Sequence, residues 1–306
     1  MKKFTFIDLF AGIGGFHQAA KNLGGKCVFA SEIDPHAQQA YLKNYNIQPF
    51  GDITRINAVD IPSHDILFAG FPCQPFSIIG DMKGFNDARG TLFFDIARIL
   101  EEKNPKAFIL ENVKQLNTHN NGNTISTIKE TLSQIGYKVH CDVLNALDFG
   151  LPQKRERTII VGFINHEAPF QFPAPTGIGN LNDILEPEET IDKKHFASQH
   201  IVNKRKKSHS SNHNPGIWHE NKAGNVTSYP FSCALRAGAS YNYLLVNGKR
   251  RLTPREMLRL QGFSDEFEIV CSDTQTRKQA GNAVPVNVIS AVLQEVLNAT
   301  TTSEGQ

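Results

Sequence analysis

Cys73 is the side chain in this sequence best placed, by type and context, to do chemistry. It lies in GFPCQPFS (70–77), where prolines on both sides keep the chain out of a helix. The apolar run Asp65–Ala69 predicts a strand, so the cysteine follows a strand's carboxyl end, where open α/β sheets bind ligands. The glycine-containing stretch Ile78–Gly90 is long enough to close over a substrate. A thiolate here can act as a nucleophile, although structural cysteines are also common, and position alone leaves both interpretations open.

Three further polar residues are predicted near the same edge. Glu111 ends the next strand-like run, Ala107–Leu110, so its carboxylate should project toward the edge that holds Cys73. Arg155 and Arg157 are two residues apart, and on a strand both would point to one face. Arginine there can bind a planar ring or a phosphate through two hydrogen bonds. An ordinary surface ion-pair cluster is the alternative interpretation.

The segment DLFAGIGGF (8–16) stands where the first predicted strand turns into the first helix. Glycines let the backbone approach a ligand closely, and a helix N-terminus offers free amides. The dinucleotide pattern G-x-G-x-x-G is absent. Glu32, at the second strand end, can accept hydrogen bonds from both ribose hydroxyls, and Asp52, near the third, can meet an adenine amino group. These features favour a nucleoside site, with simple N-capping near Asp34 and Thr54 as the alternative.

These side chains need a scaffold of strands and helices to position them. Over the first 165 residues, short apolar runs alternate with helical patterns. The predicted strands are Phe4–Phe10, Lys26–Ser31, Asp65–Ala69, Ala107–Leu110 and Arg157–Phe163. The predicted helices run to about Leu23, from Asp34-Pro35 onward, over Thr91–Glu102 and over Asn123–Ile135. This alternation predicts an α/β fold with a doubly wound, mainly parallel sheet.

The pattern changes near Asn165. Residues 169–248 are rich in Pro, Asn, Ser, His and Gly, and they predict a smaller, irregular, β-containing domain. Helical patterns return at Pro254–Gln261 and at Pro285–Leu297, and we expect the last helix to pack on the first domain. The expected division is a catalytic and cofactor-binding domain of residues 1–164 plus 270–306 and a small domain of residues 165–269.

Charge is distributed unevenly along the chain. The formal net charge is only +2, but residues 201–259 hold eleven Lys/Arg against two acidic residues, a local charge of +9, which leaves −7 for the remainder. A basic third on an acidic body favours a polyanion partner, with a solvated charged surface as the alternative. The run Lys204–Lys207 is the obvious phosphate clamp, or else a solvated loop. Trp218 is expected in the core.

Cysteine usage and apolar runs exclude several protein classes. The five cysteines are far apart, odd in number and without a CxxC pair, which disfavours a disulfide framework and a zinc site and favours a reducing cytoplasm. No apolar run approaches the length of a membrane span. We therefore expect no metal and no membrane contact.

At this point the motifs resemble those of a known family, the bacterial DNA cytosine-5 methyltransferases of restriction–modification systems. The resemblance covers almost the whole chain apart from about residues 165–248. It rests on nine segments in the family's order: DLFAGIGGF (8–16), SEID (31–34), GDIT (51–54), GFPCQPFS (70–77), GFNDARGTLFFDIARIL (84–100), ENV (111–113), QKRERTIIVGF (153–163), RLTPREMLRLQGF (251–263) and QAGNAVPVNV (279–288).

The resemblance implies roles for the matching positions. It implies a Rossmann-like domain that binds S-adenosylmethionine, with the small domain of residues 165–269 recognising the target sequence across a DNA-binding cleft. The implied catalytic residues are Cys73 as nucleophile, Glu111 as the acid that holds cytosine, and Arg155 and Arg157 as arginines on ring and phosphate. The implied cofactor residues are Phe10, Gly12, Gly14, Glu32, Ile33, Asp52, Asn282 and Val284. The expected DNA contacts are Gln74, Ser77, Lys204, Arg205 and Arg236.

The resemblance also implies an activity and its setting. The enzyme would flip a cytosine out of double-stranded DNA, bond Cys73 to carbon 6 and methylate carbon 5, releasing S-adenosylhomocysteine. It would protect host DNA from a cognate restriction endonuclease without binding that endonuclease, as a monomer in the bacterial cytoplasm at the nucleoid.

Two segments depart from the family pattern. Ala234-Leu235 stands where the family usually has Thr followed by Leu, Ile or Val, so base contacts do not transfer to this segment. Ile78-Ile79 replaces the small residues that some members have after the nucleophile loop. The alternatives are a tRNA cytosine-5 methyltransferase and a non-catalytic DNA-binding regulator. A nicotinamide oxidoreductase is disfavoured by the glycine spacing.

Overall fold

The computed structural model describes residues 3–72 and 92–302. The predicted site residues Cys73, Gln74 and Ser77 lie outside the described residues. The chain divides into two compact units. We call them the large unit (residues 1–144, 156–174 and 289–306) and the small unit (residues 145–155 and 175–288).

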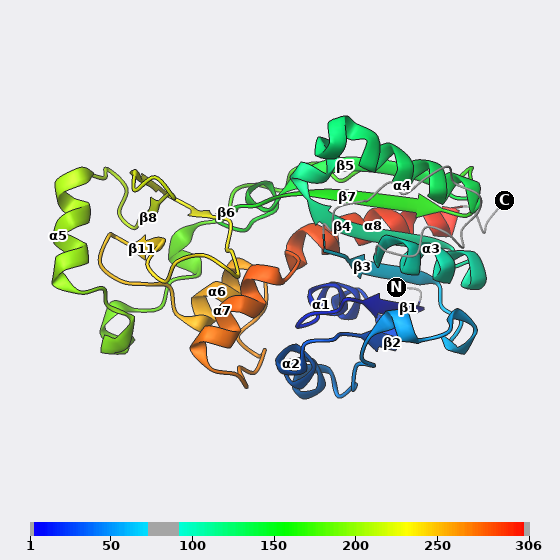
Figure 1. Cartoon of the computed structure of the whole chain (residues 1–306), viewed down its shortest axis with the longest axis horizontal. Helices are drawn as coiled ribbons and strands as arrows, with labels where there is room; N and C mark the ends of the chain where they lie inside the picture. The colour runs from blue at the N-terminus through cyan, green and yellow to red at the C-terminus, as the bar shows by residue number, and fades with distance from the viewer. Residues whose placement is uncertain (1–2, 73–91, 303–306) are drawn as a thin grey trace. The chain divides into compact units, whose positions relative to one another are not determined.

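A six-stranded mixed sheet forms the centre of the large unit, in the order β2-β1-β3-β4-β7-β5 (Figure 1). β1 is parallel to β2 and β3, β3 is parallel to β4, and β7 is antiparallel to β4. The α/β sheet that the sequence predicts is therefore confirmed, with one antiparallel strand in it. The strands are β1 (Phe4–Leu9), β2 (Gly25–Ser31), β3 (Ile66–Gly70), β4 (Ala107–Val113), β5 (Lys138–Asn145) and β7 (Glu156–Phe163).

The central strands are buried on both faces. Residues 66–69 of β3 and 107–110 of β4 are at most 2% exposed, which explains why they are continuous apolar runs without polar alternation. Their side chains join a core that includes Phe93 and Leu100 from a following helix. β5 has mostly half-buried and exposed residues, and its weak pattern explains why the sequence did not predict it.

Helix α2 of the large unit begins where the sequence has its capping residues. The side chain of Asp34 accepts a hydrogen bond from His36 N (2.9 Å), and Pro35 occupies the first turn, as predicted. The helices are α1 (Gly15–Asn22), α2 (Pro35–Tyr45), α3 (Leu92–Lys103), α4 (Asn123–Gln134) and α8 (Val286–Thr302), with short 3₁₀ turns η1 (Ile53–Arg55), η2 (Ala58–Asp60), η3 (Lys114–Asn117), η4 (His119–Gly122) and η5 (Ala146–Asp148) in or beside this unit.

α8 packs on the large unit, as the sequence predicts, because residues from 289 onward belong to it. Together with the preceding helix, α8 makes up the stretch Asp273–Thr301, which is long and apolar enough by composition to cross a membrane. An 18-residue window within this stretch has a mean hydropathy of 1.2, and 61% of that window is buried inside the protein, as expected of core helices.

The small unit contains two small sheets and three helices. One sheet is antiparallel, in the order β11-β8-β9, and the other is a short parallel pair, β10-β6. Trp218 on β8 is 7% exposed, so its predicted place in the core is confirmed. The elements are β6 (Gln153–Lys154), β8 (Ile217–Glu220), β9 (Val226–Tyr229), β10 (Ser232–Cys233), β11 (Leu244–Val246), α5 (Gln199–Ser208), α6 (Pro254–Leu260), α7 (Asp273–Asn282), η6 (Leu181–Asp183), η7 (Glu188–Thr190) and η8 (Lys193–His195).

The bounds of the small unit differ from those predicted for a small domain. β6 joins it by pairing with β10, and α7 packs on α6, so residues 145–155 and 270–288 fold with it. The assignment of target recognition to residues 165–269 stays a prediction about function.

Candidate active site

Glu111 lies at the carboxyl end of β4, beside the end of β3. The strand register pairs Gly70 of β3 with Glu111 of β4, so the glutamate is next to the point where the chain enters the GFPCQPFS segment. The Sγ of Cys73 and the side chains of Gln74 and Ser77 fall outside the described residues. What the structure places is therefore the surroundings of the predicted nucleophile segment.

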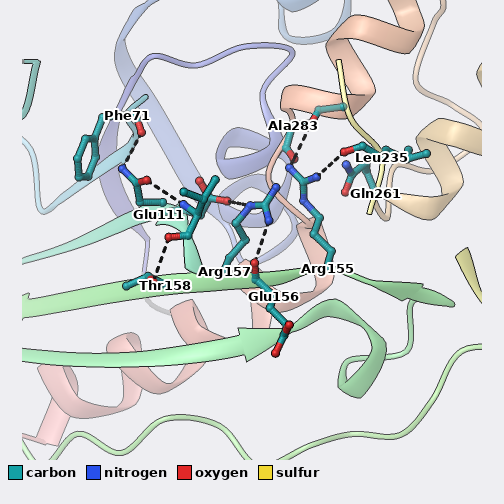
Figure 2. A network of polar contacts seen from close by, with 12 residues as sticks. Phe71, Glu111, Arg155, Glu156, Arg157, Thr158, Leu235, Gln261 and Ala283 are labelled. Atoms are coloured by element: carbon teal, nitrogen blue, oxygen red, sulfur yellow. Dashed lines mark hydrogen bonds and ion pairs between the residues drawn. The ribbon is translucent and has the colours of Figure 1, made fainter. Parts of the chain in front are cut away.

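Arg157 forms an ion pair with Glu111 (Figure 2). Its Nε lies 2.8 Å from Glu111 Oε1, and the two side chains are only 15% and 10% exposed. The antiparallel pairing of β4 with β7 brings them together, since Val113 stands opposite Arg157. Because both groups are shielded from water, this pair is held more firmly than a surface pair. The pair fixes the position of the Glu111 carboxyl group at the strand end.

Asn112 holds the first part of the nucleophile segment. Its Nδ2 donates to the carbonyl of Phe71 (2.9 Å), two residues before Cys73, and the side chain is 2% exposed (Figure 2). Asn112 is absent from the residues predicted from the sequence. The signal that could have identified Asn112 is an amide side chain directly after Glu111 at the end of a buried strand, because a buried polar side chain must find a hydrogen-bond partner.

Arg155 and Arg157 bind different partners in the described part of the chain. Residue 155 lies between β6 and β7 and belongs to the small unit. Its guanidinium, in a residue 2% exposed, donates to the carbonyls of Leu235 (3.1 Å), Gly281 (3.2 Å) and Ala283 (2.8 Å). These contacts give Arg155 a structural task, and its contact with ring or phosphate stays a prediction.

The glycine turn between β1 and α1 is built from left-handed residues. The φ angles are 55° at Phe10, 56° at Gly12 and 85° at Gly14. A Cβ at Gly14 would lie 2.2 Å from the Tyr45 ring, so only glycine fits there. Phe10 carries a side chain in a conformation that costs free energy, and such strain is concentrated at functional sites.

Glu32 connects this turn to the end of β2. One carboxylate oxygen accepts from Gly12 N (2.7 Å) and the other from Asp34 N (2.8 Å). Each oxygen can accept a second hydrogen bond, so the group can still bind two hydroxyls of a sugar. Ile33 beside it is 71% exposed and offers an apolar surface. An acid for hydroxyls with an apolar neighbour fits a nucleoside.

Asp52 lies close to Glu32 in the fold. A single bridge between Ser31 and Phe50, in which Glu32 N donates to Phe50 O (2.8 Å), brings the segment before Asp52 to the end of β2. Asp52 caps η1, because its Oδ1 accepts from both the N (3.0 Å) and the Oγ1 (2.8 Å) of Thr54. Capping uses one oxygen, so the capping role and a role in adenine binding are compatible.

A buried acid, Asp8, lies on β1 directly before the glycine turn. Asp8 is fully buried, and Tyr41 Oη donates to its Oδ2 (3.3 Å) while also contacting His17 Nδ1 (2.7 Å). Burial is the main cause that raises the pKa of Asp8 well above its usual value, and it lowers the pKa of His17 to about 3. The His17 imidazole is therefore neutral near pH 7, and burial favours the protonated form of Asp8.

The remaining predicted cofactor residues belong to the small unit. Asn282 is exposed at the end of α7, and Val284, two residues later, is 6% exposed. The carbonyls on both sides of Asn282 accept hydrogen bonds from Arg155.

The predicted DNA contacts of the small unit divide into exposed and buried residues. Lys204 is exposed on α5, 3.5 Å from Glu220. Arg236 is exposed, and its guanidinium lies 4.9 Å from the centre of the Tyr243 ring. Arg205 is 1% exposed, and it donates to Trp218 O (3.3 Å), to Asn242 O and to Glu220 (3.0 Å). Its predicted contact with DNA does not agree with this burial, and we withdraw it.

Three of the described cysteines are poor nucleophiles. Burial raises the pKa of Cys27 to about 12 and raises the pKa of Cys141 and of Cys233. Among residues 3–72 and 92–302, no group of three or more His, Cys, Asp or Glu is arranged to hold a metal ion.

Comparisons with known proteins identify the family. The model of the C-5 cytosine-specific DNA methylases matches residues 4–298. The chain is 54% identical to the type II methyltransferase M.HaeII of Haemophilus aegyptius, over 98% of this chain and 94% of that protein. It is 56% identical to M.NgoBI of Neisseria gonorrhoeae, over 94% and 91%. In fold it is similar to S. pombe Dnmt2 methyltransferase (TM-score 0.74, 22% identity, 96% and 98% covered).

A family methyl donor is implied by these matches: methyltransferases of this kind use S-adenosylmethionine, and the nucleoside-compatible groups around Glu32 fit it. A strand edge that carries a shielded Glu111–Arg157 pair fits the same chemistry. The chain belongs to the C-5 cytosine-specific DNA methylases and is a DNA cytosine-5 methyltransferase of the bacterial type II kind.

Proposed function

We propose that this enzyme methylates carbon 5 of one cytosine within a specific double-stranded DNA sequence, by base flipping and a covalent bond between Cys73 and carbon 6. The observation that supports this most strongly is the Glu111–Arg157 pair, 2.8 Å long and mostly buried, at the strand end beside the segment that holds Cys73. A shielded acid next to a cysteine loop is the pair of groups that addition to a pyrimidine needs.

Cys73 activates a carbon that is otherwise a poor nucleophile. Its thiolate adds to carbon 6, the ring loses conjugation, and the electron pair becomes available at carbon 5. A free cysteine has a pKa of about 8.5, so the thiolate needs positive charge nearby. S-adenosylmethionine supplies an electrophilic methyl group and a positive sulfonium. Once carbon 5 carries the methyl group, a water molecule takes its proton, the electron pair of the C5–H bond re-forms the C5–C6 double bond, the Cys73 thiolate is expelled, and 5-methylcytosine remains.

Glu111 stabilises the ring while the thiolate adds. Negative charge builds toward N3 as the S–C6 bond forms, and a proton held at N3 offsets it. We infer that the Glu111 carboxyl passes its proton to N3 as the S–C6 bond forms, and that the carboxylate left beside Arg157 accepts hydrogen bonds from N3–H and from the exocyclic amino group.

The predicted cofactor residues form two groups, one that would bind the nucleoside and one that lies in the glycine turn. Glu32 would accept the two ribose hydroxyls, Asp52 the adenine amino group, and the exposed Ile33 would cover the adenine ring. Phe10, Gly12 and Gly14 would let the backbone approach the methionine part. Asn282 and Val284 stay predicted contributors.

DNA is the substrate that the family implies, and the target base must leave the stack at a cost of a few kcal/mol. We propose that the exposed lysines of α5, Lys204, Lys206 and Lys207, contact phosphates and that Arg236 contacts a base. Gln74 and Ser77 stay predicted DNA contacts. The enzyme would act as a monomer in the bacterial cytoplasm, protecting DNA from a restriction endonuclease that it does not bind.

Bisulfite sequencing of DNA from a bacterial host that expresses the chain tests this function directly. We expect 5-methylcytosine in one short sequence context, lost in Cys73→Ala and kept in the matched control Cys141→Ala, which removes a half-buried thiol on β5. Methylation that survives Cys73→Ala contradicts the proposed nucleophile. Methylated tRNA cytosine with unmethylated DNA supports the RNA alternative instead.

A further inference from the structure

Arg155 joins two segments of the small unit that are distant in sequence (Figure 2). Its Nη1 donates to Leu235 O (3.1 Å), while its Nη2 donates to Gly281 O (3.2 Å) and Ala283 O (2.8 Å). Arginine can do this because its planar fork directs several N–H groups in fixed directions, which a lysine ammonium does not. One buried side chain therefore fixes residues 235 and 281–283 relative to each other.

Gln153 on β6, two residues before Arg155, also holds the segment of Leu235. It is fully buried, its Oε1 accepts from Leu235 N (2.9 Å), and its Nε2 donates to Leu260 O (2.8 Å). Both backbone groups of Leu235 are thus held by side chains of residues 153–155. The position of the peptide that leads into Arg236 is set by these contacts.

Gly281 brings the two segments into direct contact. A Cβ at this position would lie 2.4 Å from Ala237 N and 2.8 Å from Arg236 C, distances that no real Cβ atom adopts. The backbone of residues 236–237 therefore rests on the backbone of Gly281 without an intervening side chain. A displacement of one segment must displace the other.

The two segments carry residues with different predicted ligands. Arg236 is exposed directly after Leu235 and is a proposed DNA contact, while Asn282 is exposed between the two carbonyls that Arg155 binds and is a predicted cofactor contact. We propose that Arg155 and Gly281 couple DNA binding to cofactor binding, by fixing the segment of Arg236 against the segment of Asn282. This inference rests on the proposed function. It makes Arg155 a positioning residue.

Binding measurements with both ligands test the coupling. The dissociation constant of S-adenosylhomocysteine is measured by calorimetry with and without a duplex that contains the methylated sequence found by bisulfite mapping. We expect the duplex to tighten binding in the wild type by about fivefold or more. In Arg155→Lys we expect this ratio to fall to nearly one. An unchanged ratio in Arg155→Lys, or a ratio of one in the wild type, overturns the proposal while methylation itself persists.

Arg250→Lys is the matched control. Arg250 is a buried arginine of the same unit, and it binds Glu256 through two hydrogen bonds of 2.9 and 2.8 Å without touching either segment. We expect Arg250→Lys to lower stability and to keep the wild-type ratio. Loss of the ratio in Arg250→Lys as well contradicts a specific role for Arg155.

Hydrogen exchange on the wild type removes any dependence on the folding of variants. S-adenosylhomocysteine alone should slow amide exchange at residues 235–237, and the duplex alone should slow it at residues 281–284. If each ligand protects only its own segment, the two segments are independent and the proposal fails. If the wild type methylates no DNA, the proposed function fails first, which the bisulfite experiment detects separately.

Discussion

At the scale of single residues, the Glu111–Arg157 ion pair is the central feature of the site. The pair is 2.8 Å long, its side chains are 10% and 15% exposed, and both residues come from neighbouring strands. A rigid, shielded carboxylate keeps its orientation toward a base without paying the entropy of ordering a free side chain. The role of Glu111 can therefore be tested by a change that keeps its shape.

Glu111→Gln should slow methyl transfer by about 10²-fold or more, because an amide cannot stabilise a proton at N3 as a carboxylate does. Turnover is measured with a labelled methyl donor, and DNA affinity by anisotropy should change much less. Glu156→Gln is the matched control, since Glu156 pairs with Lys114 at 2.7 Å but is more exposed. A normal rate in Glu111→Gln rules out the proposed role.

The described thiols should differ sharply from a reactive cysteine. The pKa of Cys27 is raised to about 12, so its thiolate is almost absent at pH 8. We expect iodoacetamide to label Cys27, Cys141 and Cys233 slowly and Cys73 fastest, as measured by peptide mass spectrometry over time. Rapid labelling of Cys27 in folded protein disagrees with its burial.

At the scale of elements, the sequence predicts best where local signals agree. The Asp34-Pro35 start of α2 is confirmed, because an N-cap acid and a first-turn proline act within one turn. α7 is not predicted, since Asp273–Asn282 is strongly polar and becomes helical through packing on α6. The hydrogen-bond partners of Arg155 could not be predicted for a similar reason, because Leu235 lies 80 positions away in the sequence.

Gly14→Ala should destabilise the protein more than Gly12→Ala. Both residues have positive φ, which costs alanine about 1–2 kcal/mol. At Gly14 the new Cβ also meets the Tyr45 ring at 2.2 Å, whereas nothing lies within 4 Å at Gly12. Overpacking adds about 1–3 kcal/mol. Urea denaturation measures both changes, and equal losses contradict the close packing at Gly14.

Asp8→Asn should change how stability depends on pH. Burial raises the pKa of Asp8 above its usual value of 3.8, so the folded protein binds this proton more tightly than the unfolded chain does. Wild-type stability from this group is therefore complete below pH 3.8 and is lost as pH rises toward the raised folded-state pKa. Relative to wild type, Asp8→Asn should gain stability between pH 5 and pH 8 in urea denaturation. A constant difference across that range means that Asp8 is ionised in the fold.

At the scale of the whole molecule, basic charge is concentrated in the small unit. Lys206→Glu with Lys207→Glu should weaken binding to any duplex and flatten the salt dependence, since each lost phosphate contact removes about 0.9 from the log–log slope. Anisotropy titrations at several salt concentrations measure the slope. Lys26→Glu with Lys129→Glu, two exposed lysines of the large unit, changes net charge equally. Equal effects of the two pairs mean that α5 makes no specific contact.

The most direct test of the central claim is covalent capture on DNA that carries 5-fluorocytosine at the methylated position. Fluorine cannot leave carbon 5 as a proton does, so the bond between sulfur and carbon 6 should persist after methyl transfer. The account predicts a denaturant-resistant protein–DNA adduct that mass spectrometry assigns to Cys73. An adduct on another cysteine, or none with a duplex whose unfluorinated form is methylated, contradicts it.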